Sequence, residues 1–404
     1  MAAHPRCRAC LRGARAQLGR KRGALRGAIP ATDAQRRGRG VTGVAGLRIG
    51  IVGPLPPPAG GMAMQTRQLA ELLGAAQARV ELVPTNPSYR PAWVARLRGV
   101  RALFRLLPYL AALWRAAGRV DVLHVMANSG WSWHLFAAPA IWVARVRRTP
   151  VVVNYRGGEA GPFLAKSAAV VRASLRHVAR LVVPSGFLQD VFARHGIRSE
   201  IVPNIVDLQR FRPGARVGEA QIIVARNLEP IYDNATAIRA FAQVHARHAG
   251  ARLVLAGTGP EEGELRALAA SMGLQAVVEF AGRLDRDTMA ARLRASRIAL
   301  NPSRVDNMPN SVLEAMASGV AVVSTRVGGV PYIVEHGRTA LLVPPADPDA
   351  MAQALLALLE DEGLHERLRT QALTEVQAYT WEAVGPQWAA VYREVAHMAP
   401  QAAG

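Results

Sequence analysis

Short apolar runs alternate with longer amphipathic stretches through most of the chain. A continuous apolar run of about 4–8 residues between turn residues is typical of a strand that is covered on both faces. The stretches between the runs, such as the one that contains Leu69, Leu72 and Leu73, are typical of amphipathic helices. Strands that alternate with helices predict parallel sheets. The expected buried strands lie at residues 49–53, 150–153, 222–226, 253–257, 277–282, 298–300 and 321–324.

The length of the chain fits two such sheets. With 404 residues, half of them apolar, the chain can bury two ordinary cores. We therefore expect an α/β protein of two doubly wound, Rossmann-like domains that face each other across a cleft. Their expected bounds are residues 47–214 and 215–380. In such folds ligands bind at the carboxyl ends of the strands, and the candidate residues below follow strands.

The net charge of +21 is unevenly distributed. Residues 1–46 carry eleven basic residues and one acidic residue, Asp33, and they have no apolar run long enough for a signal peptide. We expect this segment to be a disordered basic extension, and a later natural start of translation is an open alternative. Cys7 and Cys10 form a C-x-x-C within it, but no second ligand pair accompanies them, so a zinc site is not expected.

The stretch 303–319 carries the most informative chemistry. Asp306 and Glu314 flank the start of an expected helix, and Asn310 or Ser311 is its expected N-cap. The free N–H groups and the positive dipole end of such a helix suit a phosphate or diphosphate. A carboxylate in the first turn can bind sugar hydroxyls. The same residues also fit a plain buried helix with a charge near its N-terminus.

This stretch resembles the E-x7-E signature of the family 4 glycosyltransferases, with Asp306 in place of the usual first Glu and Glu314 in the second position. The resemblance covers about residues 47–396. It implies the GT-B fold, a C-terminal helix at 381–404 that crosses back onto the first domain, and sugar transfer with retention of configuration. It also implies a UDP- or GDP-sugar donor and a hydroxyl acceptor, which a lipid can carry, in cell-surface polysaccharide or glycolipid synthesis.

The resemblance assigns roles to residues outside the signature. Arg226 is expected to contact the donor diphosphate, while the Lys that many members carry five residues later is Ile231 here. Arg156 stands where the first domain often has a His, and it could bind an anionic group. Gly60 and Gly61, between the first strand and its helix, leave N–H groups open to an anion. The expected catalytic set is Asp306, Glu314 and Arg226, and the expected donor-binding set is Gly282, Arg283, Asn307, Met308, Pro309, Asn310, Ser311 and Glu314.

Other functions fit parts of the sequence. A nucleotide-sugar epimerase or phosphorylase would share the fold, and a non-catalytic scaffold with a decayed site would account for Ile231 and Arg156. Specific nucleic-acid binding is disfavoured, because the arginines are dispersed, aromatic residues are only 5% and no reader motif is present. Asp285 and Asp287 form a D-x-D, but they precede an expected helix and are expected to cap it. We expect no metal and no cofactor.

A basic and aromatic stretch at residues 93–114 indicates a further partner. Its arginines recur at helical spacing, and Pro108 is expected to kink or divide the helix. The stretch fits an amphipathic helix packed on its own sheet, or a surface for an anionic membrane. Because no apolar run approaches about 18 residues, we expect a cytoplasmic protein, at most peripheral on the inner face of the cell membrane. The side chains concerned are Trp93, Arg98, Arg101, Phe104, Arg105 and Trp114.

Overall fold

The computed structural model describes residues 43–57, 60–87, 101–214 and 220–398, without the side chains of 101–103. Most of the expected basic extension, including Cys7 and Cys10, lies outside these residues. Within the described part, Val44 is fully buried in the same hydrophobic cluster as Ile49. Packing therefore begins within residues 43–46, inside the segment predicted as the extension, whose bounds stay a prediction.

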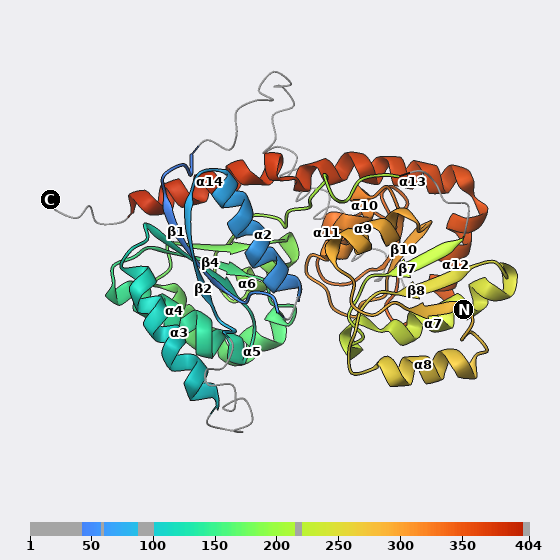
Figure 1. Cartoon of the computed structure of the whole chain (residues 1–404), viewed down its shortest axis with the longest axis horizontal. Coiled ribbons are helices and arrows are strands. Elements are labelled where there is room, and N and C mark those ends of the chain that lie inside the picture. The colour runs from blue at the N-terminus through green and yellow to red at the C-terminus, as the bar shows by residue number, and fades with distance from the viewer. Residues whose placement is uncertain (1–42, 58–59, 88–100, 215–219, 399–404) are drawn as a thin grey trace, which may run out of the picture. The chain divides into compact units, whose positions relative to one another are not determined.

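The first sheet has six parallel strands in the order β2-β1-β3-β4-β5-β6 (Figure 1). Ile51 of β1 lies opposite Leu82 of β2 and His124 of β3. The strands are β1 (Arg48–Gly53), β2 (Arg79–Pro84), β3 (Val122–Ala127), β4 (Val151–Tyr155), β5 (Arg180–Val183) and β6 (Glu200–Ile201). The helices between them are α2 (Gly61–Ala75), α3 (Arg101–Ala117), α4 (Ala138–Val146), α5 (Ala160–Leu175) and α6 (Gly186–Arg194), with one π-helical turn, η2 (Trp133–Ala137), before α4.

The second sheet also has six parallel strands, in the order β12-β11-β10-β7-β8-β9 (Figure 1). Its strands are β7 (Gln221–Val224), β8 (Arg252–Leu255), β9 (Val278–Phe280), β10 (Ile298–Asn301), β11 (Ala321–Thr325) and β12 (Leu341–Val343). Its helices are α7 (Asn234–Arg247), α8 (Glu262–Ser271), α9 (Arg286–Arg294), α10 (Asn310–Ala317), α11 (Val330–Ile333) and α12 (Pro348–Glu360), with the 3₁₀ turn η3 (Pro230–Tyr232) before α7. The strand order reverses between β7 and β10, as in a doubly wound nucleotide-binding sheet. The two parallel α/β sheets confirm the predicted fold class.

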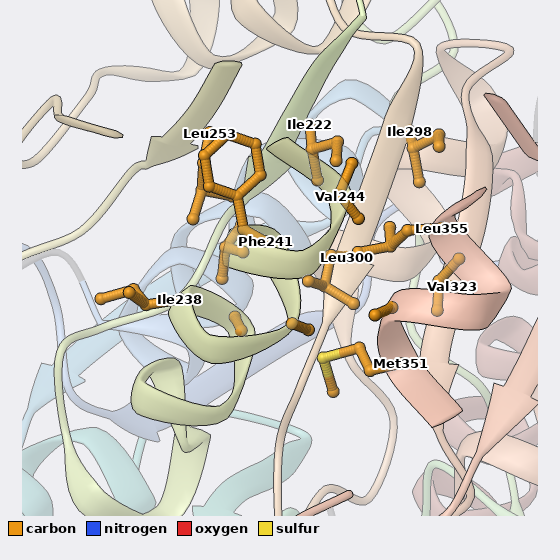
Figure 2. Close-up of a cluster of buried hydrophobic side chains, with 14 of the residues drawn as sticks. Ile222, Ile238, Phe241, Val244, Leu253, Ile298, Leu300, Val323, Met351 and Leu355 are labelled. Atoms are coloured by element: carbon orange, nitrogen blue, oxygen red, sulfur yellow. The ribbon is translucent and has the colours of Figure 1, made fainter. Parts of the chain in front are cut away.

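Apolar side chains from strands and helices fill the second domain between the sheet and α7 and α12. Figure 2 shows Ile222, Leu253 and Leu300 of the sheet beside Phe241 of α7 and Leu355 of α12. These side chains are at most 2% exposed, so truncating one of them would leave a cavity. This packing fixes β7 beside β10 and thereby sets the positions of the loops that follow both strands.

The last helix, α14 (Trp381–His397), packs against the first sheet. Its Trp388 and Tyr392 are fully buried in the same cluster as Ile49 of β1. The hydroxyl of Tyr392 is hydrogen-bonded to Nδ1 of His124 on β3 (2.8 Å), and burial lowers the pKa of His124 to about 3. A neutral His124 therefore joins α14 to the first sheet. Between α12 and α14 the chain forms α13 (Glu362–Glu375) and a 3₁₀ turn, η4 (Val376–Tyr379). The domain bounds 47–214, 215–380 and 381–404 stay predictions.

Helix α3 contains part of the basic and aromatic stretch. Pro108 lies inside α3 without dividing it, so of the two predicted effects the division is wrong, and a kink stays a prediction. Tyr109 and Leu113 are buried in the core, in agreement with a helix packed on its own sheet, and the Tyr109 hydroxyl donates to the Phe136 carbonyl (2.8 Å). Trp93 and Arg98 lie outside the described residues. None of the described helices is both long enough and apolar enough to cross a membrane.

Candidate functional site

The point where the second sheet reverses brings Arg226 and Asp306 together. Arg226 follows β7 and Asp306 follows β10, and these strands are adjacent. Nη2 of Arg226 forms an ion pair with Oδ2 of Asp306, and Nε of Arg226 donates to Oδ1 of Asn301 (2.8 Å). The side chains of Arg226 and Asp306 are 12% and 11% exposed. Two residues expected from sequence to act on the donor are thus in direct contact at the usual ligand position of such a sheet.

Burial sets the electrostatics of Asp306. Loss of water around the carboxyl group raises its pKa above the ordinary value, while the Arg226 charge and hydrogen bonds from Ser303 and the Asn307 amide act in the opposite direction. The carboxylate therefore depends on its cationic partner. A ligand that draws Arg226 away must supply hydrogen-bond donors to Asp306 in exchange.

Glu314 lies in the middle of α10 and is also largely withdrawn from water. Burial raises its pKa to about 7, opposed by the charges of Arg286 and Arg226. In the described part of the chain, no hydrogen bond or ion pair engages its side-chain oxygens. A largely buried carboxyl group without a fixed partner is unusual in a protein interior, so Glu314 is available to accept hydrogen bonds from a ligand.

The start of α10 differs from the prediction. The helix begins at Asn310 with Pro309 as its N-cap and without a side-chain capping bond, so the expected capping by Asn310 or Ser311 is wrong. The reason is that Oδ1 of Asn310 accepts hydrogen bonds from Gln65 Nε2 and Asn204 Nδ2, each at 2.8 Å. The N–H groups of the first turn are consequently not covered by a side-chain cap of their own.

Arg156 follows β4 and reaches the same group of residues. Its Nη1 donates to Oε1 of Gln65 and to Oδ1 of Asn204, and its backbone carbonyl accepts from Nδ2 of Asn307 (3.2 Å). Burial lowers the pKa of the Arg156 guanidinium to about 10. Among the described residues no carboxylate pairs with it, and its Nε is buried without a hydrogen-bond partner. A buried cation with only amide partners favours an anionic ligand nearby.

The predicted glycines have different surroundings. Gly60 is the N-cap of α2. A Cβ at Gly60 or Gly61 would meet no atom within 4 Å, so a ligand has room to approach the backbone there. Gly282 has a φ of +66°, which favours glycine. The neighbouring Arg283 is exposed, and its Nη2 is 3.3 Å from Oγ1 of Thr258. No hydrogen bond or ion pair joins Arg283 to Asp306 or Glu314 among the described residues.

Several residues that position the candidate site were not predicted from the sequence. Gln65 and Asn204 bridge Arg156 and Asn310. Gly329 lies so close to the signature loop that a Cβ would come within 1.6 Å of the Asn307 carbonyl oxygen, and its N–H donates to the Asp306 carbonyl (2.8 Å). The Gly328–Gly329 pair was the available signal, because adjacent glycines after a strand often allow close backbone approach.

Two other acidic groups have structural roles. Oδ1 of Asp285 accepts from the backbone N–H groups of Asp287 (3.0 Å) and Thr288 (2.8 Å), which confirms helix capping. On α13, Glu362, His365 and Glu366 approach one another closely enough to be considered for a metal. However, Glu362 and Glu366 already form ion pairs with Arg297 and Arg369, so this group is accounted for by structural contacts.

Two family models match the two halves of the chain. The model of Glycosyltransferase Family 4 matches residues 59–210, and the model of Glycosyl transferases group 1 matches residues 220–361. The chain belongs to the family 4 glycosyltransferases. The family predicted from the sequence is therefore confirmed.

A curated relative agrees with this family 4 assignment, and solved structures share the GT-B fold. The phosphatidyl-myo-inositol mannosyltransferase of Mycolicibacterium smegmatis is 28% identical over 379 residues, which cover 86% of this chain and 94% of the relative. The chain covers only 25% and 57% of two other curated relatives. The sucrose-phosphate synthase of Thermosynechococcus elongatus superposes with a TM-score of 0.72 at 21% identity, over 86% of this chain and 99% of that one. HepE of Anabaena, solved with UDP-glucose, superposes with a TM-score of 0.67 at 17% identity, over 85% of this chain and 98% of that one.

Proposed function

We propose that the protein transfers a sugar from a nucleotide-sugar donor to a hydroxyl acceptor with retention of the anomeric configuration. The observation that carries this proposal is the contact of Arg226 with Asp306 at the reversal point of the second sheet, beside Glu314, whose carboxyl group has no protein partner among the described residues. Such a set offers a cation for a diphosphate and carboxylates for sugar hydroxyls.

In the proposed reaction the bond between sugar C1 and the diphosphate oxygen breaks, and its electron pair moves to that oxygen. C1 forms a bond to the acceptor oxygen on the same face, and the released diphosphate takes up the acceptor proton. Arg226 and the uncapped first turn of α10 stabilise the negative charge that develops on the diphosphate. Asp306 holds the donor sugar, and Glu314 accepts from the ribose hydroxyls. Neither carboxylate is required to attack the sugar.

UDP or GDP is the proposed nucleotide. The structure of HepE with UDP-glucose supports a uridine donor on this fold, while the phosphatidyl-myo-inositol mannosyltransferase is named for a lipid-borne acceptor. Arg156, with its unpaired Nε, is placed to bind an anionic group of the donor or acceptor. A role in glycolipid or cell-surface polysaccharide synthesis follows from these likenesses as part of the proposal.

The surface of α3 and α4 supports attachment to an anionic membrane. The two helices lie against each other (Figure 1) and carry large exposed apolar side chains, and the guanidinium of Arg147 lies 5.0 Å from the Trp114 ring. Aromatic and aliphatic side chains beside arginines suit a lipid interface. The exposed apolar residues on these helices are Phe104, Leu107, Trp114, Trp142 and Val146. A peripheral position on the cytoplasmic face would bring a lipid-linked acceptor within reach.

The decisive experiment measures what happens to a panel of UDP- and GDP-sugars. A transferase releases UDP or GDP in step with glycosylation of an added acceptor, and the one-bond C–H coupling at C1 of donor and product reports retention by NMR. Loss of activity in Glu314→Gln, with activity kept in Glu382→Gln on the exposed start of α14, would place the reaction in this site. Conversion of the donor sugar without release of nucleotide would indicate an epimerase, and absence of any turnover would indicate a scaffold.

A further inference from the structure

The loop after β7 departs from the family pattern in a way that the structure compensates. Ile231 occupies the position where many members carry Lys, and its apolar side chain is 39% exposed. Arg304, from the loop after β10, lies directly beside Ile231. The backbone N–H of Arg304 donates to the Ile231 carbonyl (2.8 Å). Position 231 therefore carries no positive charge itself, but an arginine on the adjoining loop lies next to it.

The side chain of Arg304 is held in place by Asp233. Nε of Arg304 lies 2.9 Å from Oδ2 of Asp233, whose side chain is only 3% exposed. Asp233 has a left-handed backbone (φ 45°, ψ 47°), and although it stands at the N-cap of α7 its side chain makes no capping bond. A strained aspartate whose carboxylate serves a guanidinium instead of the helix indicates that the position of Arg304 matters.

The side chain of Arg304 is largely exposed to solvent despite this ion pair. Its side chain is 57% exposed, and within the described structure the only side-chain hydrogen bond is the one from Nε. The Asp233 ion pair raises the pKa of Arg304 above its already high value, so the group is always charged. Nη1 and Nη2 thus make no hydrogen bond with the described residues, and a guanidinium can bind two phosphate oxygens at once with such a pair of groups.

Arg304 also lies close to the proposed catalytic residues. The segment that binds it, residues 231–233, includes Tyr232, and the Arg226 guanidinium lies 5.1 Å from the ring of Tyr232. Arg304 is two residues before Asp306, the ion-pair partner of Arg226. The same two loops consequently carry one buried arginine, fixed by Asp306, and one exposed arginine, fixed by Asp233.

We propose that Arg304 binds the diphosphate of the donor and supplies the second positive charge that position 231 lacks. The inference rests on the proposed function. Arg226 acts from within the protein and Arg304 from the solvent side, and both stabilise the charge that develops as the C1–O bond breaks. Arg304 would contact the phosphate next to the sugar, so its contribution should be absent for a nucleoside monophosphate.

Calorimetry with UDP, UMP, GDP and GMP tests this assignment on the full chain. Arg304→Gln should lower affinity for the preferred nucleoside diphosphate about tenfold, which is about 1.4 kcal/mol, and should change monophosphate affinity less than twofold. Arg292→Gln is the matched control, because Arg292 is also an ion-paired, partly exposed arginine of the second domain but lies on α9. It should leave both affinities unchanged.

Rescue separates ligand binding from a structural role. Adding Ile231→Lys to Arg304→Gln should restore most of the diphosphate affinity and of kcat, because it returns a cation to the same loop pair. Since Arg304→Gln leaves Asp233 buried without its partner, the pair Asp233→Asn with Arg304→Gln provides a fold control by thermal melting, and it should show the same selective loss.

Equal loss for diphosphate and monophosphate, or no loss, would overturn the role of Arg304 while leaving wild-type transfer intact. Wild-type protein that binds neither UDP nor GDP would instead overturn the proposed function and this inference with it.

Discussion

Replacement of Glu314 by Gln should stabilise the unliganded protein and weaken its binding of the donor. Burial raises the pKa of Glu314 from its ordinary 4.5 to about 7. The folded protein thus holds this proton more tightly than the unfolded chain, and wild-type stability falls as the pH rises from about 4.5 to about 7. The difference corresponds to up to roughly 3 kcal/mol above pH 7. A neutral Gln of the same shape removes this pH-dependent cost.

Urea unfolding of the wild type and Glu314→Gln at several pH values measures the effect. The variant should be more stable by under about 1 kcal/mol at pH 5, and by up to roughly 3 kcal/mol at pH 8. Glu382→Gln, on the exposed first turn of α14, serves as the control and should give a small difference that does not vary with pH. A variant that is less stable than wild type at pH 8 would mean that the Glu314 carboxylate has a stabilising partner, contrary to the structure.

The same variant should bind the donor more weakly. A charge-assisted hydrogen bond to a ribose hydroxyl contributes about 1.5–3 kcal/mol, which is roughly 10- to 150-fold in affinity for the UDP- or GDP-sugar. Unchanged affinity by calorimetry would remove Glu314 from the site. Opposite effects on stability and binding would show that the residue is kept for function at a cost to the fold.

Three further predictions address the other parts of the molecule. Arg226→Ala should lower kcat at least tenfold with a smaller change in KM, because charge on the diphosphate grows in the transition state; steady-state kinetics with activity within threefold of wild type would exclude that role. Trp114→Ala with Trp142→Ala, in protein lacking residues 1–42, should reduce sedimentation with anionic liposomes at low salt and leave the melting temperature nearly unchanged, whereas equal sedimentation would reject the lipid surface. Tyr392→Phe should cost about 1–3 kcal/mol by leaving the buried Nδ1 of His124 without its partner, and unfolding curves that superpose on the wild type would contradict this.

Seven of the twelve described strands, namely β1, β4 and β7 to β11, could be predicted, because the sheets are parallel and covered on both faces. The run at 298–300, for example, became β10, where Ile298 and Leu300 are at most 2% exposed. Burial on both faces leaves a continuous apolar signal that needs no tertiary information. Division of α3, one of the two effects predicted for Pro108, does not occur, because a proline removes one N–H bond but does not by itself break a helix that packs into the core, as α3 does through Tyr109 and Leu113.

The charged residues of the candidate site could be named from the sequence, but the partners that hold them could not. Asp306 and Glu314 stand at a recognisable spacing in one segment, whereas the partners of Arg156 lie 91 and 48 residues away, at Gln65 and Asn204. Amides carry no charge pattern and no periodicity, so a sequence gives no reason to pair them. The same limit explains the wrong N-cap, since Asn310 is a good capping residue whose side chain is used by a long-range bond instead.

The ion pair of Arg226 and Asp306 links the binding of a donor's diphosphate to the binding of its sugar. Asp306 is stable as an anion because Arg226 lies against it, and burial otherwise favours its neutral form. A diphosphate that attracts Arg226 weakens that support, and the hydroxyls of the attached sugar can then replace it by donating to Asp306. A nucleoside diphosphate without a sugar attracts Arg226 but offers no sugar hydroxyls to Asp306. Under the proposed function, the arrangement would favour the complete nucleotide sugar over the released diphosphate, which is the preference that a transferase needs in order to bind its donor and release its product.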